Sequence, residues 1–134
     1  MRGAELGIDT TFAQWTLAGA ISYLDTENRS GVYEGNDLAR RAKNSARIDL
    51  DRAFGDFRIG FTANGEGKRY DDVANTRRLP GYGTLDLRAE YAINADLIVQ
   101  ARVANVFDHD YETAAFYNQA GREWFLTLRY APSN

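Results

Sequence analysis

Residues 84–91 read Thr84-Leu85-Asp86-Leu87-Arg88-Ala89-Glu90-Tyr91, an unbroken alternation of apolar and polar side chains. Successive side chains of a β-strand point to opposite faces, so this stretch predicts a strand with one apolar and one charged face. The same two-residue period recurs along most of the chain and predicts about seven strands. Their predicted ranges are 5–12, 15–23, 46–51, 57–64, 84–91, 97–103 and 123–130.

The connections between these strands alternate between short and long. Residues 13–14, 54–56 and 94–96 predict tight turns, whereas residues 25–41, 68–83 and 108–122 are long, polar and rich in Tyr, Asn and Gly. Bacterial outer-membrane barrels have short periplasmic turns and longer extracellular loops. The pattern therefore predicts an all-β fold, an antiparallel up-and-down meander that forms part of a transmembrane β-barrel.

Periodicity alone also fits a soluble β-barrel or sandwich whose apolar face is turned inward. Two features favour the membrane. The apolar face mixes small and large residues while the polar face carries both charge signs, and every long loop falls at one end of the strands. Aromatic residues near strand ends also fit the girdles of a membrane barrel. They are Phe12, Trp15, Tyr23, Phe54, Phe57, Tyr91, Trp124 and Tyr130.

Composition narrows the possible functions. The chain has 134 residues, 44% of them apolar, and no cysteine, which excludes disulfides and thiolate sites. Its net charge of −3 comes from interspersed acids and bases, so nucleic acid is not an expected partner. No apolar run reaches the roughly 18 residues of a spanning helix.

The sequence contains no nucleophile motif, phosphate loop or catalytic triad, and we expect no enzymatic activity. Asp49 and Asp51 share one strand face, as a pair of glycosidase acids would, but a ladder of charges in a barrel lumen explains them more simply. His109 lies between Asp108 and Asp110 in a polar loop, where we expect a solvated side chain rather than a metal ligand.

Three strings resemble those of TonB-dependent outer-membrane receptors. Arg2-Gly3-Ala4-Glu5 is similar to a string that opens a barrel strand in that family. Residues 105–111 (NVFDHDY) and 121–123 (GRE) resemble strings near the family's C-terminus, in the same order. Within the family, residues 38–45 (LARRAKNS) and 113–123 are similar to the corresponding stretches of cobalamin receptors.

The resemblance implies a function in the bacterial outer membrane. It implies that cobalamin, the transported ligand of the full-length protein, is captured at the extracellular face, and that the TonB complex supplies energy through a plug domain. Partners would then be cobalamin, outer-membrane lipid and the TonB complex, with no cofactor and no metal held by this chain. Other ligands of the same family, such as a ferric siderophore, and a soluble barrel that binds a small apolar ligand remain alternatives.

Two residues correspond to ligand-facing positions of the family, and these are Arg40 and Tyr117. An arginine offers several donors to the amides or phosphate of a corrinoid, and a tyrosine offers a flat face and a hydroxyl. The alternative interpretation makes Arg40 and Arg41 ordinary strand-end charges and Tyr117 an interfacial aromatic.

The strand count also bears on domain organisation. With seven strands, the first and the last both run toward the periplasm, so Gly3 is expected at the extracellular face and Asn134 in the periplasm. A complete barrel starts and ends on one side. We therefore expect residues 1–134 to form the C-terminal segment of a receptor barrel, with the plug domain and upstream strands outside this sequence and Met1 not the native start.

Overall fold

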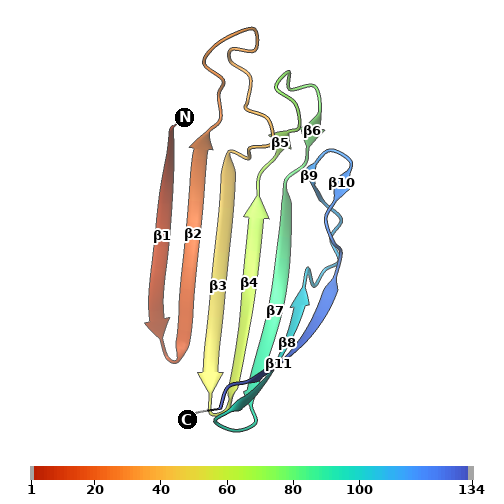
Figure 1. The fold of residues 1–134 in the computed structure, drawn as a ribbon. Helices are drawn as coiled ribbons and strands as arrows, with labels where there is room; N and C mark the ends of the chain where they lie inside the picture. Colours follow the sequence, from red (N-terminus) through yellow and green to blue (C-terminus); the bar gives the residue numbers. More distant parts are fainter. Residues whose placement is uncertain (1, 133–134) are drawn as a thin grey trace.

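A computed structural model describes residues 2–132, so the expectations for Met1 and Asn134 lie outside the described residues. Seven long antiparallel strands form one sheet in the order β1-β2-β3-β4-β7-β8-β11, which confirms the predicted meander (Figure 1). No helix in the described part of the chain could cross a membrane. The long strands are β1 (Arg2–Phe12), β2 (Trp15–Asp25), β3 (Asn44–Phe54), β4 (Phe57–Glu66), β7 (Tyr82–Ala92), β8 (Leu97–Ala104) and β11 (Glu123–Tyr130).

The long connections contain structure that the sequence analysis predicted only as loops. One holds the hairpin of β5 (Arg69–Tyr70) and β6 (Arg78–Leu79), and another holds the hairpin of β9 (Glu112–Ala114) and β10 (Tyr117–Asn118). The loop prediction was wrong at these residues because strands of two or three residues are too short to show a period of two.

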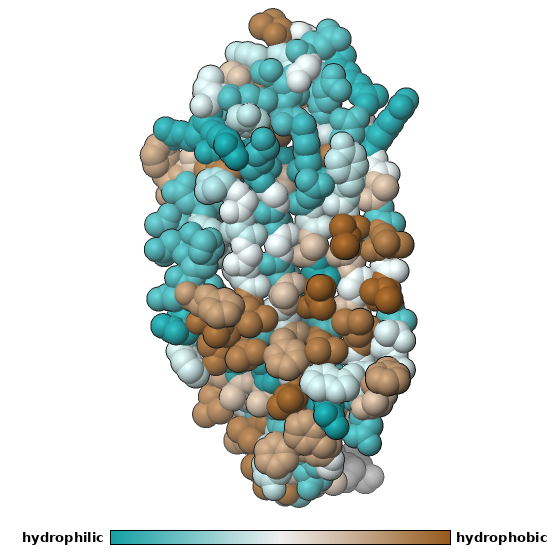
Figure 2. Space-filling view, turned by 180° about the vertical axis from the view of Figure 1, so that it is seen from behind, coloured by the Kyte–Doolittle hydropathy of each residue, from teal (hydrophilic) through white to brown (hydrophobic). Residues whose placement is uncertain are grey.

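The register of the sheet collects the predicted apolar residues on one face. One row across the sheet runs through cross-strand partners on six strands, and it consists of Leu17, Leu50, Phe61, Leu87, Val103 and Trp124. We call this apolar side of the sheet the outward face. Many of its side chains are exposed, including Leu6 at 74% and Leu126 at 79%. Apolar side chains gather over the lower and middle part of this face, below hydrophilic loops (Figure 2). A continuous apolar surface of this kind requires an apolar environment.

The opposite face carries a network of charges across β3, β4 and β7. Arg88 donates from Nε to Asp51 Oδ1 over 3.1 Å and from Nη1 to Thr62 Oγ1 over 2.7 Å. Thr62 in turn donates to Asp49 Oδ1 over 2.6 Å, and Arg47 Nε donates to Asp49 Oδ2 over 2.6 Å. The interpretation of Asp49 and Asp51 as parts of a charge ladder is therefore confirmed.

The two outer strands of the sheet each lack a neighbour on one side in the described part of the chain. Every residue of β1 and of β11 is exposed. The sheet curls toward β11 without closing (Figure 1). Each free edge presents unpaired N–H and C=O groups, which hydrocarbon cannot satisfy and which template pairing with other strands.

We expect residues 1–134 expressed alone in water to aggregate or pair edge to edge, because both sheet edges and the apolar face are uncovered. Sedimentation velocity measures this directly. A monodisperse monomer with well-dispersed amide signals in its NMR spectrum would contradict the lipid-facing assignment of the apolar face.

Gly60 gives a second prediction. A Cβ at this position would lie 2.3 Å from Asp51 Oδ1 and 2.6 Å from Arg88 Nε, so Gly60→Ala must displace their ion pair. We expect a complete receptor barrel carrying it to be destabilised by roughly 1–3 kcal/mol, measured as a lower temperature for the loss of compact mobility in SDS gels. Gly7→Ala is the matched control, since its Cβ would meet only Gly19 O at 3.8 Å. Equal midpoints for the two variants would refute the packing argument.

Candidate functional site

The three long connections pack against one another at one end of the sheet, and we call residues 26–43, 67–81 and 105–122 the loop layer. This layer, rather than the sheet, contains most of the buried side chains of the described chain. Thr26 is fully buried and Leu79 is 3% exposed. The others in the layer are Arg69, Asn105 and Ala115. Loops with a buried interior of their own hold a fixed shape, which a ligand site needs.

The first two loops are joined by hydrogen bonds between their backbones and side chains. Arg40 N donates to Tyr70 O over 2.6 Å. Asp37 N donates to Asn75 Oδ1 over 2.7 Å, and Asn75 Nδ2 donates back to Asp37 O over 2.8 Å. Asn75 adopts a left-handed φ of 58°, which asparagine tolerates better than most residues.

Asp71 connects all three loops. Its Oδ1 accepts a hydrogen bond from the backbone N of Ala115 over 3.0 Å and from Arg40 Nε over 2.9 Å. The Ala115 bond first and the Arg40 guanidinium second hold the pKa of the Asp71 carboxyl below its ordinary value of 3.8. A lowered pKa means that the junction is fully stabilising above pH 3.8 and is lost as pH falls through the lowered value.

The structure places both predicted ligand residues at this junction. Arg40 has a left-handed φ of 58°, and its side chain remains 59% exposed although it is paired with Asp71. The bond to Asp71 raises the pKa of the Arg40 guanidinium, and the phenol of Tyr117 adds a smaller contribution of the same sign. Tyr117 lies on β10, two residues after Ala115, and is 69% exposed. Both side chains therefore present free surface from loops held together by Asp71.

A polar hollow of about 380 Å³ lies below the loop layer on the charged face of the sheet. The rings of Tyr82 and Tyr111 stack on one side of it, with centroids 4.1 Å apart. Arg69 is nearly buried behind Tyr82, with Cζ 5.3 Å from the ring centre and Nη2 2.5 Å from Glu66 Oε2. The hollow offers a flat aromatic surface beside amide, hydroxyl and carboxylate groups.

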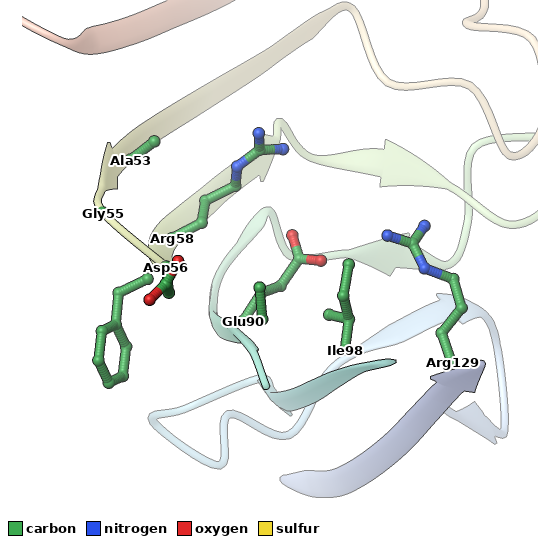
Figure 3. Close-up of a pocket in the computed structure, with 9 residues that line it drawn as sticks. Ala53, Gly55, Asp56, Arg58, Glu90, Ile98 and Arg129 are labelled. Atoms are coloured by element: carbon green, nitrogen blue, oxygen red, sulfur yellow. The ribbon is translucent and has the colours of Figure 1, made fainter. Parts of the chain in front are cut away.

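The charged face continues to the opposite end of the sheet. There a hollow of about 230 Å³ is lined by residues of β3, β4, β7, β8 and β11. Arg58 on β4, Glu90 on β7 and Arg129 on β11 line this hollow from the same side of the sheet (Figure 3). One wall of the sheet is thus polar over its whole length, as the lumen wall of a barrel is.

The backbone of His109 forms hydrogen bonds that stabilise its loop. Its N donates to Asn105 Oδ1 over 3.0 Å, and its carbonyl accepts from Asn105 Nδ2 over 2.9 Å. Among residues 2–132 no group of three or more His, Asp and Glu is arranged to hold a metal ion.

The sequence analysis did not identify Asp71, which lies within the long polar loop predicted over residues 68–83. The sequence contains a partial signal, because Asp72 and Asn75 are turn-forming residues. In the structure Asp72 accepts hydrogen bonds from Thr76 N over 3.1 Å and from Arg77 N over 2.8 Å. That signal predicts the turn that presents Asp71. The partners of Asp71 lie 31 and 44 residues away, and no local pattern indicates them.

The chain is similar in sequence to a vitamin B12 transporter, BtuB, of Photobacterium profundum. The two are 34% identical over 128 residues, which cover 92% of this chain and 21% of the relative. The chain therefore spans about a fifth of that protein's length.

Solved structures of receptors also resemble the chain. The siderophore receptor PiuA from Acinetobacter baumannii superposes with a TM-score of 0.84 at 28% identity, over 96% of this chain and 21% of that one. A mutant of the ferric enterobactin receptor PfeA from Pseudomonas aeruginosa, 21% identical, shares the fold with a TM-score of 0.78, over 96% of this chain and 22% of that one.

The family described as TonB dependent receptor-like, beta-barrel matches residues 1–106. In a membrane barrel of this kind, the apolar face of the sheet meets lipid and the charged face lines the lumen. Together with the seven-strand meander, the family match establishes that the chain belongs to the TonB-dependent receptor family and is a bacterial outer-membrane protein.

Proposed function

We propose that residues 1–134 form the C-terminal part of the barrel of an importer that takes up cobalamin. The observation that carries this proposal is the 34% identity to a vitamin B12 transporter along 92% of the chain. The free edges of β1 and β11 support the barrel assignment, because further strands would pair them. In this proposal the chain supplies a section of the barrel wall and three extracellular loops.

Within this importer, Arg40 and Tyr117 contact the ligand. Both lie on the loop layer, both are more than half exposed, and both belong to loops that Asp71 fixes. The Arg40 guanidinium donates to amide or phosphate oxygens, and the Tyr117 ring packs on a flat or apolar part of the corrinoid. Holding the two side chains in place before binding reduces the entropy lost on association.

Energy for transport comes from outside the chain in this proposal. The TonB complex acts through a plug domain inside the barrel, and the charged lumen face of β3, β4 and β7 is the surface that such a domain would meet. The chain's own contribution is binding and enclosure.

A second candidate ligand is a ferric siderophore. The siderophore receptor PiuA is 28% identical and superposes with a TM-score of 0.84, and this likeness supports the second candidate. Equilibrium binding of cyanocobalamin and of ferric siderophores to the full-length receptor separates the two candidates. Binding of a ferric siderophore without cobalamin would replace the first proposal by the second.

Substitution of the two ligand residues tests their role. In the full-length receptor we expect Arg40→Gln to weaken cyanocobalamin binding by roughly tenfold or more, because a charged donor is lost. Tyr117→Leu is expected to weaken binding less, since part of the apolar contact is kept. Arg41→Gln is the matched control, one residue away and exposed. Unchanged affinity in the Arg40→Gln, Tyr117→Leu double variant would reject both assignments.

Asp71→Asn tests the junction. The amide keeps the shape of the side chain but loses the charge that orients Arg40, and we expect cyanocobalamin affinity to fall by roughly two- to tenfold. The ratio of the variant's cyanocobalamin affinity to the wild-type affinity should be the same at about pH 5.5 and about pH 7.5, because the lowered pKa keeps Asp71 ionised at both. A ratio that rises steeply between these two values would contradict the lowered pKa.

A further inference from the structure

The outward face of the seven long strands carries three charged side chains. Arg2 and Asp25 have opposite signs and are cross-strand partners at the end of the strands that bears the long loops. Arg52 lies at the other end, two residues before the end of β3 at Phe54, and has no such partner. An arginine on the lipid face destabilises a barrel strongly at the membrane centre and little near the interface, so the position of Arg52 fits the periplasmic interface.

Aromatic rings hold the Arg52 guanidinium but do not neutralise it. Its Cζ lies 5.2 Å from the ring centre of Trp15 and 5.8 Å from that of Phe54. Its Nε is buried and makes no hydrogen bond within the described residues. No ion pair of the described chain includes Arg52. The arrangement leaves one positive charge at the headgroup level without an anion.

An apolar hollow of about 300 Å³ begins beside Arg52 on the same face. Ile59, the cross-strand partner of Arg52, forms part of its lining. Small side chains make the floor, because Ala89 and Ala101 are direct partners on β7 and β8. The remaining lining residues are the apolar Phe61, Leu87, Val103 and Trp124, together with Gly60 and Arg88.

The hollow begins level with the arginine and extends deeper into the membrane. Arg52, Ile59, Ala89 and Ala101 are partners in one row across the sheet, whereas Phe61, Leu87 and Val103 belong to a row two residues farther from the short turns. At about 3.3 Å per residue, the hollow extends farther from the short turns than Arg52 does. A cation at the interface with an apolar hollow above it matches the order of headgroup and acyl chain in a lipid.

We propose that Arg52 and this hollow form a binding site for one phospholipid of the periplasmic leaflet. The phosphate pairs with the Arg52 guanidinium between Trp15 and Phe54, and an acyl chain lies in the hollow over Ala89 and Ala101. The site uses the outward face alone and is independent of the transported ligand.

Native mass spectrometry of the full-length receptor in detergent, titrated with dioleoylphosphatidylglycerol, tests the site. A basic residue near a membrane surface contributes about fivefold to anionic lipid binding, so Arg52→Gln should reduce the occupancy of the bound lipid by about that factor. Arg58→Gln is the matched control, because it removes the same charge from the lumen face of the neighbouring strand and should leave occupancy unchanged. Compact mobility in SDS gels verifies that each variant is folded.

Filling the hollow tests the acyl-chain half separately. We expect Ala101→Leu to lower lipid occupancy, whereas Ala63→Leu, on the same face but outside the hollow, should not. Equal lipid occupancy in wild type and Arg52→Gln would overturn the proposal. Removal of the bound lipid by inorganic phosphate alone would also overturn it, because the site would then bind a free anion. A lipid-free dimer that Arg52→Gln dissociates would overturn it as well, because the site would then bind a second copy of the chain. None of these readouts involves cobalamin, so failure here is distinct from failure of the proposed ligand.

Discussion

A sheet in lipid has to pair every backbone N–H and C=O within the protein, because hydrocarbon offers no alternative partner. The rest of this structure depends on that constraint. It explains why the strands are long and regular and why each pairs with its neighbour in the sheet. It also means that the outer edges of β1 and β11 require partners. It also makes the sheet a section of a closed wall, since closure is the arrangement that removes edges altogether.

Because side chains alternate between the two faces along each strand, a single sheet separates lipid on one side from the barrel lumen on the other. The outward side chains meet lipid and are apolar, with aromatic rings near the short turns. The inward side chains form a connected set of charges, in which Arg88 pairs with Asp51 and Thr62 joins Arg88 to Asp49. Gly60 matters here because the absence of a Cβ gives Arg88 and Asp51 room to meet. Arg52 departs from this alternation at the short-turn end of the sheet, and its surroundings of Trp15, Phe54 and an adjoining apolar hollow account for it as a contact with a lipid headgroup.

The loops follow different rules from the sheet. They contain most of the buried side chains, their short hairpins have little regular pairing, and they are joined by specific polar contacts such as Asp37 with Asn75 and Asp71 with Arg40. Recognition of a ligand belongs to this part of the molecule, since loops carried by a rigid scaffold vary without cost to the fold. The same separation explains why receptors of one family share the sheet while their loops bind different ligands.

Local sequence was enough to define the seven strands, their antiparallel order, the short and long ends and the two faces, because a period of two and turn residues are properties that each strand carries separately. It also identified Asp49 and Asp51 as ladder charges. Tertiary packing was needed to reveal the role of Asp71, the hairpins within the loops and the hollow beside Arg52. Asp71 contacts residues 31 and 44 positions away, and the hollow needs Ala89 and Ala101 to be partners on adjacent strands. Contacts of that kind depend on register and loop packing, which arise only when the strands come together.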